Sequence, residues 1–177
     1  GKTTMLNIMS GIVQPSEGKL LFDGVDVTTL STSERNIAQV FQFPVIYGTM
    51  TVEQNLAFPL VCRNYERPAI DAKVQEVAEA LSLQGLLKKS ASRLTADQKQ
   101  LISLGRGLVR DDVAAVLMGE PLTVIDPDLK FRLRRQLKEI NQKYRSTLIY
   151  VTHDQIEAMT FSENIIALDP GSIVQLG

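Results

Sequence analysis

The 177-residue sequence is poor in the residues that build disulfides and metal clusters. It holds one cysteine, Cys62, one histidine, His153, and no tryptophan. A single cysteine excludes an internal disulfide and a cysteine-based metal cluster, and it fits a reducing compartment. A single histidine excludes a metal site with several histidine ligands.

The sequence also lacks an excess of one charge and a long apolar run. Lys plus Arg number 19 and Asp plus Glu number 20, which gives a formal net charge of −1. Dedicated nucleic-acid binders usually carry a strong basic excess, so we expect no nucleic-acid partner. No apolar run approaches the roughly 18 residues that cross a bilayer. The length suits one folded domain, or a domain with a small inserted subdomain.

Strand and helix patterns alternate along much of the chain. Apolar runs predict strands at 19–22, 37–41, 114–118 and 147–152. Apolar spacing predicts helices at 3–10, 129–144 and 154–161. Two final strands, 164–168 and 172–176, flank Pro170-Gly171 and predict a hairpin. Strands that alternate with helices indicate an α/β fold with a parallel sheet.

A helical block interrupts this alternation. Helical spacing dominates in 51–64, 70–82 and 97–109, and no strand pattern lies between them. We therefore expect an α/β core of residues 1–45 and 111–177, with residues 46–110 as an inserted helical subdomain. Because the chain opens on Gly1, inside what looks like a motif, we treat it as a fragment.

That first motif, Gly1-Lys2-Thr3-Thr4, has the form of the tail of a phosphate-binding loop. Backbone N–H groups at a helix start hold phosphate oxygens. Lys2 would neutralise the β- and γ-phosphates, and the hydroxyl of Thr3 would ligate Mg²⁺. Four residues alone also fit an ordinary exposed helix start.

Two strand ends carry the remaining chemistry. Glu120 follows an apolar strand, which suits a general base or a residue that positions water. His153 stands where the next buried strand ends, and it could donate a hydrogen bond to a γ-phosphate. Each residue could also have a purely structural role. Glu120 could cap the following segment, and His153 could be a polar residue at the end of a strand.

In this order, the three pieces resemble the nucleotide-binding subunit of ABC transporters. Val40-Phe41-Gln42 resembles the family's Q-loop, and the run from Leu94 to Gln100 stands where the signature LSGGQ-x-Q belongs. The run from Glu120 to Asp126 is similar to the Walker B tail and D-loop. The run from Thr152 to Met159 resembles the H-loop, in the form found in importers of maltose, other sugars and glycerol phosphate. The resemblance implies a P-loop NTPase (RecA-like) core that lacks its first strands and the start of its phosphate loop.

The resemblance also implies the cofactors ATP and Mg²⁺ and a set of site residues. Glu120 would polarise the attacking water, His153 would hold the γ-phosphate and that water, and Gln42 would contact Mg²⁺ or the water. Thr3 and Gln42 would be the metal ligands. The ATP-binding residues would be Gly1, Lys2, Thr3, Thr4, Leu94, Thr95, Ala96, Asp97, Gln98 and Asp126, the last communicating across a dimer.

In this family, ATP binds between two subunits, so the implied partners are a second ATP-binding subunit and transmembrane permease subunits. One subunit supplies the phosphate loop, the Glu and the His, and the other supplies the signature. The block 51–110 would carry the surface that grips the permease. The implied location is the cytoplasmic face of the inner or plasma membrane.

Two departures from the family pattern put hydrolysis in question. Gly119 stands where the family has the Walker B aspartate, and Thr95-Ala96-Asp97 replaces Ser-Gly-Gly in the signature. The first removes a Mg²⁺ anchor, and the second adds Cβ atoms and a negative charge near a phosphate. Because the two defects lie on opposite halves of a composite site, we hypothesise a degenerate subunit that works beside a better-equipped paralogue.

Three alternatives remain open. Gly119 and Asp97 favour a nucleotide-sensing or scaffold subunit that never hydrolyses ATP. Four intact residues oppose it, namely Lys2, Gln42, Glu120 and His153. An ABC protein of DNA repair or translation is opposed by the H-loop run. A generic P-loop kinase or GTPase is opposed by the order of all the motifs.

Overall fold

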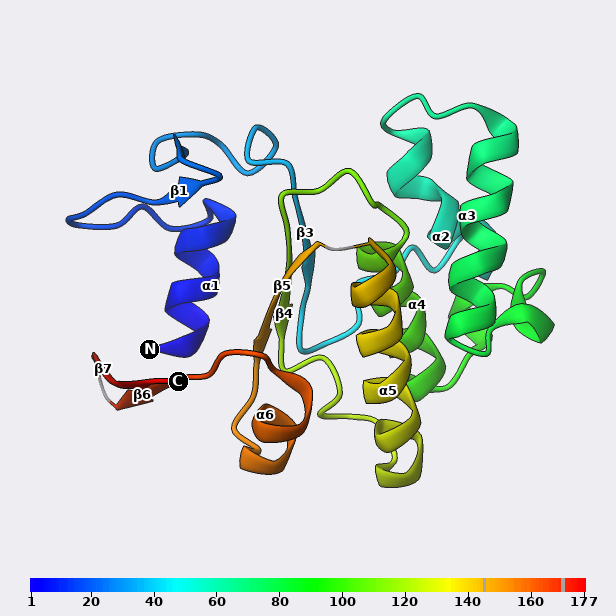
Figure 1. The fold of residues 1–177 in the computed structure, drawn as a ribbon. Coiled ribbons are helices and arrows are strands. Elements are labelled where there is room, and N and C mark those ends of the chain that lie inside the picture. The colour runs from blue at the N-terminus through cyan, green and yellow to red at the C-terminus, as the bar shows by residue number, and fades with distance from the viewer. Residues whose placement is uncertain (145, 170) are drawn as a thin grey trace.

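A three-stranded parallel sheet forms the centre of the computed structural model, which describes residues 1–144, 146–169 and 171–177 (Figure 1). Its strands lie in the order β3-β4-β5, and their bounds are Ile37–Val40, Ala115–Gly119 and Thr147–Val151. Both pairings are parallel, with Val116 opposite Ala38 on one side and Leu148 on the other. The predicted parallel α/β sheet is thus confirmed.

Helices cover both faces of this sheet. One face carries α1, and the other carries α4 and α5, as Figure 1 shows. These helices have the bounds Lys2–Ser10, Ala96–Leu108 and Pro127–Tyr144. Strand β4 is buried on both sides, as its apolar run predicts: Ala115 and Leu117 pack with Leu6 of α1, while Val116 and Met118 join the larger cluster opposite.

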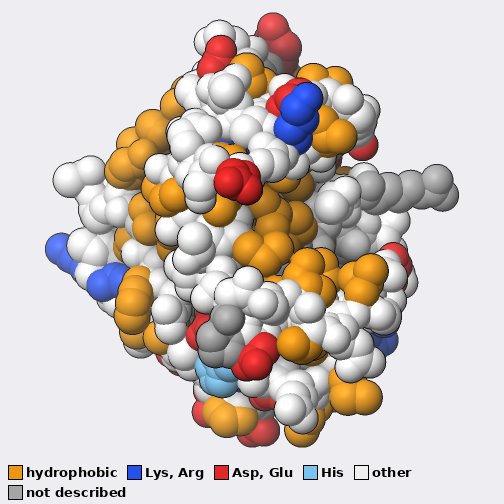
Figure 2. Space-filling model, turned by 90° about the vertical axis from the view of Figure 1, so that its left-hand side faces the viewer, with side chains coloured by type: hydrophobic (Ala, Val, Ile, Leu, Met, Phe, Trp, Pro, Cys, Tyr) orange, Lys and Arg blue, Asp and Glu red, His pale blue; other side chains and the backbone are white. Residues whose placement is uncertain are grey.

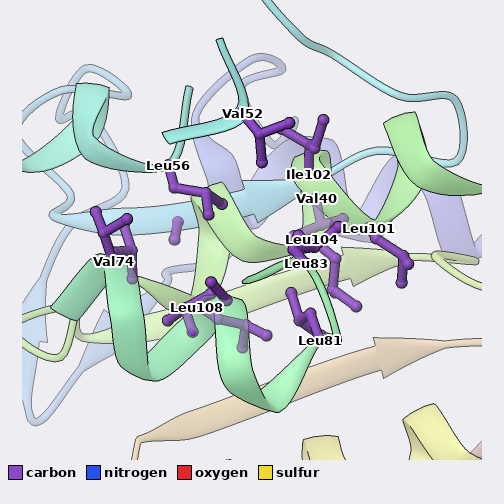
Figure 3. Packing of buried hydrophobic residues seen from close by; sticks show 14 of the residues in the cluster. Val40, Val52, Leu56, Val74, Leu81, Leu83, Leu101, Ile102, Leu104 and Leu108 are labelled. Atoms are coloured by element: carbon purple, nitrogen blue, oxygen red, sulfur yellow. The ribbon is translucent and has the colours of Figure 1, made fainter. Parts of the chain in front are cut away.

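The helical block packs as a group of helices against one another and against the sheet. Its elements are α2 (Val52–Val61), α3 (Arg67–Ala80), α4, and the short 3₁₀ turns Gln84–Leu86 and Ala91–Arg93. Leu56, Val74, Leu81 and Leu104 meet in the interior shown in Figure 3. This cluster continues without a break to Val40 of β3, so the helical block and the sheet share one apolar core.

A glycine allows α4 to approach its neighbours closely. A Cβ atom on Gly105 would lie 2.5 Å from Leu56 and 3.1 Å from Leu81. Real Cβ contacts are longer, and Val77 would lie at 3.2 Å, so three side chains would have to move.

Gly105→Ala is therefore expected to destabilise the protein. Overpacking costs about 1–3 kcal/mol, which exceeds the gain of about 1 kcal/mol from better helix propensity. Thermal unfolding should shift down by about 2–4 °C. Gly85→Ala is the matched control, because a Cβ there would meet no atom within 4 Å. Equal melting temperatures for the two variants would contradict this account.

Smaller elements complete the fold. They are the helix α6 (Gln155–Phe161) and two antiparallel pairs, β1 (Leu21–Phe22) with β2 (Val25–Asp26) and β6 (Ile166–Asp169) with β7 (Ser172–Leu176). The predicted final hairpin is confirmed, although Pro170 lies outside the described residues. Strand β1 is shorter than the predicted 19–22, because the N–H of Leu20 donates to the side chain of Thr28 at 2.8 Å.

Within the described ranges, no helix combines the length and apolarity needed to span a membrane.

Candidate functional site

The structure brings Glu120 and His153 together at the carboxyl ends of two adjacent strands. Strands β4 and β5 end in register at Gly119 and Val151, and the N–H of Glu120 donates to the carbonyl of Val151 at 3.0 Å. Just beyond these strand ends, the side chains of Glu120 and His153 meet. His153 Nδ1 lies 3.2 Å from Glu120 Oε2. Glu120 is 26% exposed and His153 68%, so the pair is open to solvent on the imidazole side.

The backbone of Glu120 is held in an unusual conformation. Its φ is +51°, in the left-handed region that residues other than glycine rarely adopt. The N–H and hydroxyl of Thr123 both donate to its carbonyl, at 3.3 and 3.1 Å. Such backbone strain costs about 1–3 kcal/mol and clusters at functional sites.

A small polar cavity of about 120 Å³ lies beside this pair. Thr123, Lys130 and Thr152 also line it. The volume accommodates a few water molecules. An ionised carboxylate only accepts hydrogen bonds, so a neutral His153 would donate through Nδ1 and keep the lone pair of Nε2 for another group. The pair can therefore orient and polarise a water molecule in the cavity.

Gln42 lies two residues beyond the end of β3 and is exposed. The preceding residue, Phe41, is held by Gln100 of α4. Gln100 is buried, and the sequence predicted no role for it. The amide nitrogen of Gln100 donates to the carbonyl of Phe41 at 3.3 Å and to that of Pro121 at 2.7 Å. One side chain of the helical block thus holds the residue before Gln42 and the residue after Glu120. Its only sequence signal was its place at the end of the signature run.

The motif at the start of α1 lies beside a second, larger cavity. Lys2 lines a cleft of about 580 Å³ between α1, β5 and the β6–β7 hairpin, whereas Thr3 and Thr4 are exposed. Figure 2 shows hydrophobic side chains gathered on the face that carries these elements. Thr152 lines both cavities, so Lys2 borders a cleft adjacent to the Glu120–His153 pair without entering the same cavity.

The signature residues form the start of α4 and line neither cavity. The hydroxyl of Thr95 accepts from the N–H of Gln98 at 3.4 Å, and the Gln98 side chain accepts from the N–H of Thr95 at 3.2 Å. Leu94 is buried, while Ala96 and Asp97 lie in the first helical turn. Asp126 is exposed, and its carboxylate accepts from the N–H of Asp128 at the start of α5. Within this chain, these residues therefore do not line the small cavity beside Glu120.

Gly119 places no side chain next to Glu120. An added Cβ would lie 3.3 Å from the end of Leu6 and 3.8 Å from the carbonyl of Val40. No cluster of three or more His, Cys, Asp or Glu side chains suited to a metal occurs among the described residues. A metal here would therefore depend on hydroxyl and amide oxygens, such as those of Thr3 and Gln42, together with phosphate and water.

Comparison with known proteins identifies the family of this chain. The family model described as ABC transporter matches residues 1–123. The chain is 41% identical to the trehalose/maltose import ATP-binding protein MalK of Thermococcus litoralis, covering 100% of this chain and 49% of that protein. It is 38% identical to the sn-glycerol-3-phosphate import ATP-binding protein UgpC of Burkholderia thailandensis, again covering 100% of this chain and 49% of that protein. The chain spans about half the length of the curated relatives it matches. It belongs to the ABC transporter family.

Proposed function

We propose that this chain is the ATP-binding part of an importer subunit, which couples ATP binding and hydrolysis to uptake of a sugar, polyol or glycerol-phosphate-like solute. The observation that carries the proposal is the contact between Glu120 and His153, 3.2 Å apart at the ends of adjacent parallel strands. A ligand site at this edge of the sheet is typical of α/β proteins. The names of the relatives support the class of solute.

Residues of the core would bind the nucleotide, and the helical block of residues 46–110 would carry the signature. The permease surface would lie on this block and on the segment that leads into it. Gly1, Lys2, Thr3 and Thr4 would hold the phosphates of ATP at the start of α1. Thr3 and Gln42 would hold Mg²⁺, which neutralises phosphate charge when bound. Glu120 would take the role of water-polarising residue, and His153 would hold the γ-phosphate and the water. Gln100 supports this assignment by fixing the backbone beside both Gln42 and Glu120.

The composite site would require a second ATP-binding subunit. The signature residues Leu94 to Gln98 lie outside both cavities of this chain, which fits a role toward a partner's ATP across the contact near Asp126. Gly119 would belong to one half of a composite ATP site and Asp97 to the other half. In a pair with a better-equipped paralogue, each of the two ATP sites would therefore hold only one defect. A non-hydrolysing nucleotide sensor is the second candidate, and the absent carboxylate at Gly119 is the observation that favours it.

Exposed apolar side chains between Phe41 and Val61 would contact the permease at the cytoplasmic face of the membrane. We call this surface the 41–61 patch, and its exposed large apolar residues are Phe41, Phe43, Val45, Tyr47 and Val61. Arg106 of α4 stacks over the Tyr47 ring at 4.4 Å and donates to the carbonyl of Val45 at 2.8 Å. The patch is thus fastened to the helix that begins with the signature, and exposed apolar patches of this kind mark interaction sites.

Purification from membranes tests the proposal directly. The tagged full-length protein would be expressed in its own host, solubilised in mild detergent and purified. We expect it to bring down permease subunits with several membrane-spanning helices, and the vesicles holding this complex to take up the solute when ATP is present. Recovery only in the soluble fraction, without any membrane subunit, would count against the importer assignment.

Phe43→Ser is expected to lower the amount of co-purified permease severalfold while leaving the melting temperature unchanged. Phe43 is 68% exposed, so its ring contributes little to the folded chain alone. Phe131→Ser is the matched control, because Phe131 on α5 is also 68% exposed but lies outside the patch. Equal recovery of permease with both variants would remove the 41–61 patch from the interface.

A further inference from the structure

Glu157 is a buried carboxylate for which the proposed mechanism has no use. It lies on α6, is 6% exposed, and contributes to the lining of the small cavity beside Glu120 and His153. Burying a carboxylate is unfavourable unless it is hydrogen-bonded and paired with a cation. A carboxylate retained at such a depth therefore calls for a physical explanation.

Three donors from two other elements meet this carboxylate. The Thr152 hydroxyl donates to it at 2.8 Å and the Tyr150 hydroxyl at 3.2 Å, while the Arg134 guanidinium on α5 lies 3.5 Å away. Burial and the neighbouring Glu157 raise the pKa of Tyr150, so the Tyr150 hydroxyl stays protonated and remains a donor. Glu157 thus joins α5, α6 and the end of β5 at one point.

This network holds the chain on both sides of His153. The Thr152 hydroxyl, while donating to Glu157, accepts from the N–H of Asp154 at 3.0 Å. The Asp154 carboxylate caps α6 by accepting from the N–H groups of Ile156 and Glu157, at 2.8 and 3.2 Å. Among the described residues, the hydrogen-bond partner of the His153 ring is Glu120. The place of its ring is therefore set through its two neighbours.

We propose that Glu157 is a positioning residue that acts through Thr152 to hold the His153 ring against Glu120. The inference rests on the proposed function for its biological meaning, but the positioning itself is a property of the folded protein without nucleotide. A carboxylate suits this task because it accepts from two hydroxyl donors at once and pairs with Arg134. An apolar residue of similar size would leave Thr152 without its acceptor.

The proton on His153 reports this positioning. Contact with the Glu120 carboxylate keeps the proton of the neutral ring on Nδ1, whereas a ring released into water favours the tautomer with the proton on Nε2. The two tautomers differ in their ring ¹⁵N chemical shifts. The measurement is NMR of the ¹⁵N-labelled full-length protein at alkaline pH without nucleotide, with the His153 signals identified by their loss in His153→Gln.

Four variants separate positioning from general stability. We expect the Nδ1-protonated form to dominate in the unmodified protein and to become the minor form in Glu157→Leu. Thr152→Val should have the same effect, because it breaks the same link while leaving Glu157 in place. Glu157→Gln keeps an oxygen acceptor and should retain the dominant Nδ1-protonated form. Glu139→Leu is the control for loss of a carboxylate, since Glu139 pairs with Arg135 on the exposed side of α5.

The proposal is overturned if the Nδ1-protonated form still dominates in Glu157→Leu and Thr152→Val, or if it is already the minor form in the unmodified protein. If Glu157→Leu fails to fold, Thr152→Val decides between the two results. The measurement needs neither ATP hydrolysis nor a permease. A failed importer assignment would therefore leave this result standing, and a failed positioning role would leave the importer assignment untouched.

Discussion

Gly119→Asp is expected to tighten binding of Mg²⁺-ATP to the full-length protein about 10- to 100-fold. A charge-assisted contact contributes about 1.5–3 kcal/mol, and each 1.4 kcal/mol or so is tenfold in affinity. The new carboxylate would stand at the end of β4, next to Glu120, where it could hold the hydration shell of the metal. ATP binding in the presence of a chelator should change little.

The Cβ atom of this aspartate requires only a small shift of one neighbouring side chain. Its Cβ would lie 3.3 Å from Leu6 Cδ1, the flexible end of a side chain, and 3.8 Å from the carbonyl of Val40. Calorimetric titration with ATP, in Mg²⁺ and in chelator, measures the effect. Gly119→Asn is the matched control of nearly equal size without charge. If Asn tightens binding as much as Asp, or if the gain persists in chelator, the missing metal anchor is not the defect.

Asp97→Gly is expected to strengthen the ATP-dependent association of two ATP-binding subunits by up to about 1000-fold. Two like charges about 4 Å apart repel by roughly 4 kcal/mol at an effective dielectric of 20, which sets the upper end of the gain. Removing the Cβ atom also lets the backbone approach the phosphate more closely.

The same substitution should weaken the fold. Asp97 lies in the first turn of α4, where a carboxylate interacts favourably with the helix dipole. Losing that interaction and replacing Asp by Gly costs the helix about 0.5–1.5 kcal/mol in total. The local stability of α4 therefore gives a reason for an acidic residue at a position where phosphate recognition favours glycine.

Sedimentation of the full-length protein with ATP measures this association, in a Glu120→Gln background that we expect to prevent turnover. Asp97→Asn removes the charge but keeps the Cβ, so it separates the two causes. We expect Asn to recover the electrostatic part of the gain. Unchanged association with both Asn and Gly would show that position 97 does not face the γ-phosphate.

Regular elements of the fold were predictable because their signals are local. The continuous apolar run that forms β4 indicated a strand buried on both faces, and alternation of strands with helices indicated a parallel sheet. The end of β5 differs by one residue from its prediction, because the Thr152 side chain bonds to the N–H of Asp154 where the strand ends. Such a contact depends on the conformation of the following turn.

Long-range polar contacts escaped the sequence analysis. Arg35 is buried, and its guanidinium donates to the backbone carbonyls of Leu30, Thr28, Ile8 and Met9. Ile8 and Met9 lie in α1, at least 26 residues away in the sequence. Gln100 and Glu157 likewise act on segments distant in the sequence. No periodicity marks such residues, since their partners are brought together only by the tertiary fold.

The sequence and the family resemblance indicated Glu120 and His153 as site residues, each by itself. Their contact follows from the register of β4 and β5, which a single sequence does not specify. Lys2 and the signature residues stay apart from this pair within the chain, and their roles remain predictions. They are expected to act only in the complete nucleotide site and across the contact with a partner subunit.

The central claim is that the two defects, Gly119 and Asp97, make this protein dependent on a better-equipped partner. Steady-state ATPase activity of the full-length protein, purified alone, tests this claim most directly, with Glu120→Gln as the control for contaminating activity. We predict that the protein binds ATP and that its turnover does not exceed that of the control. Brisk turnover that Glu120→Gln abolishes would contradict the claim, because a pair of identical subunits would then suffice.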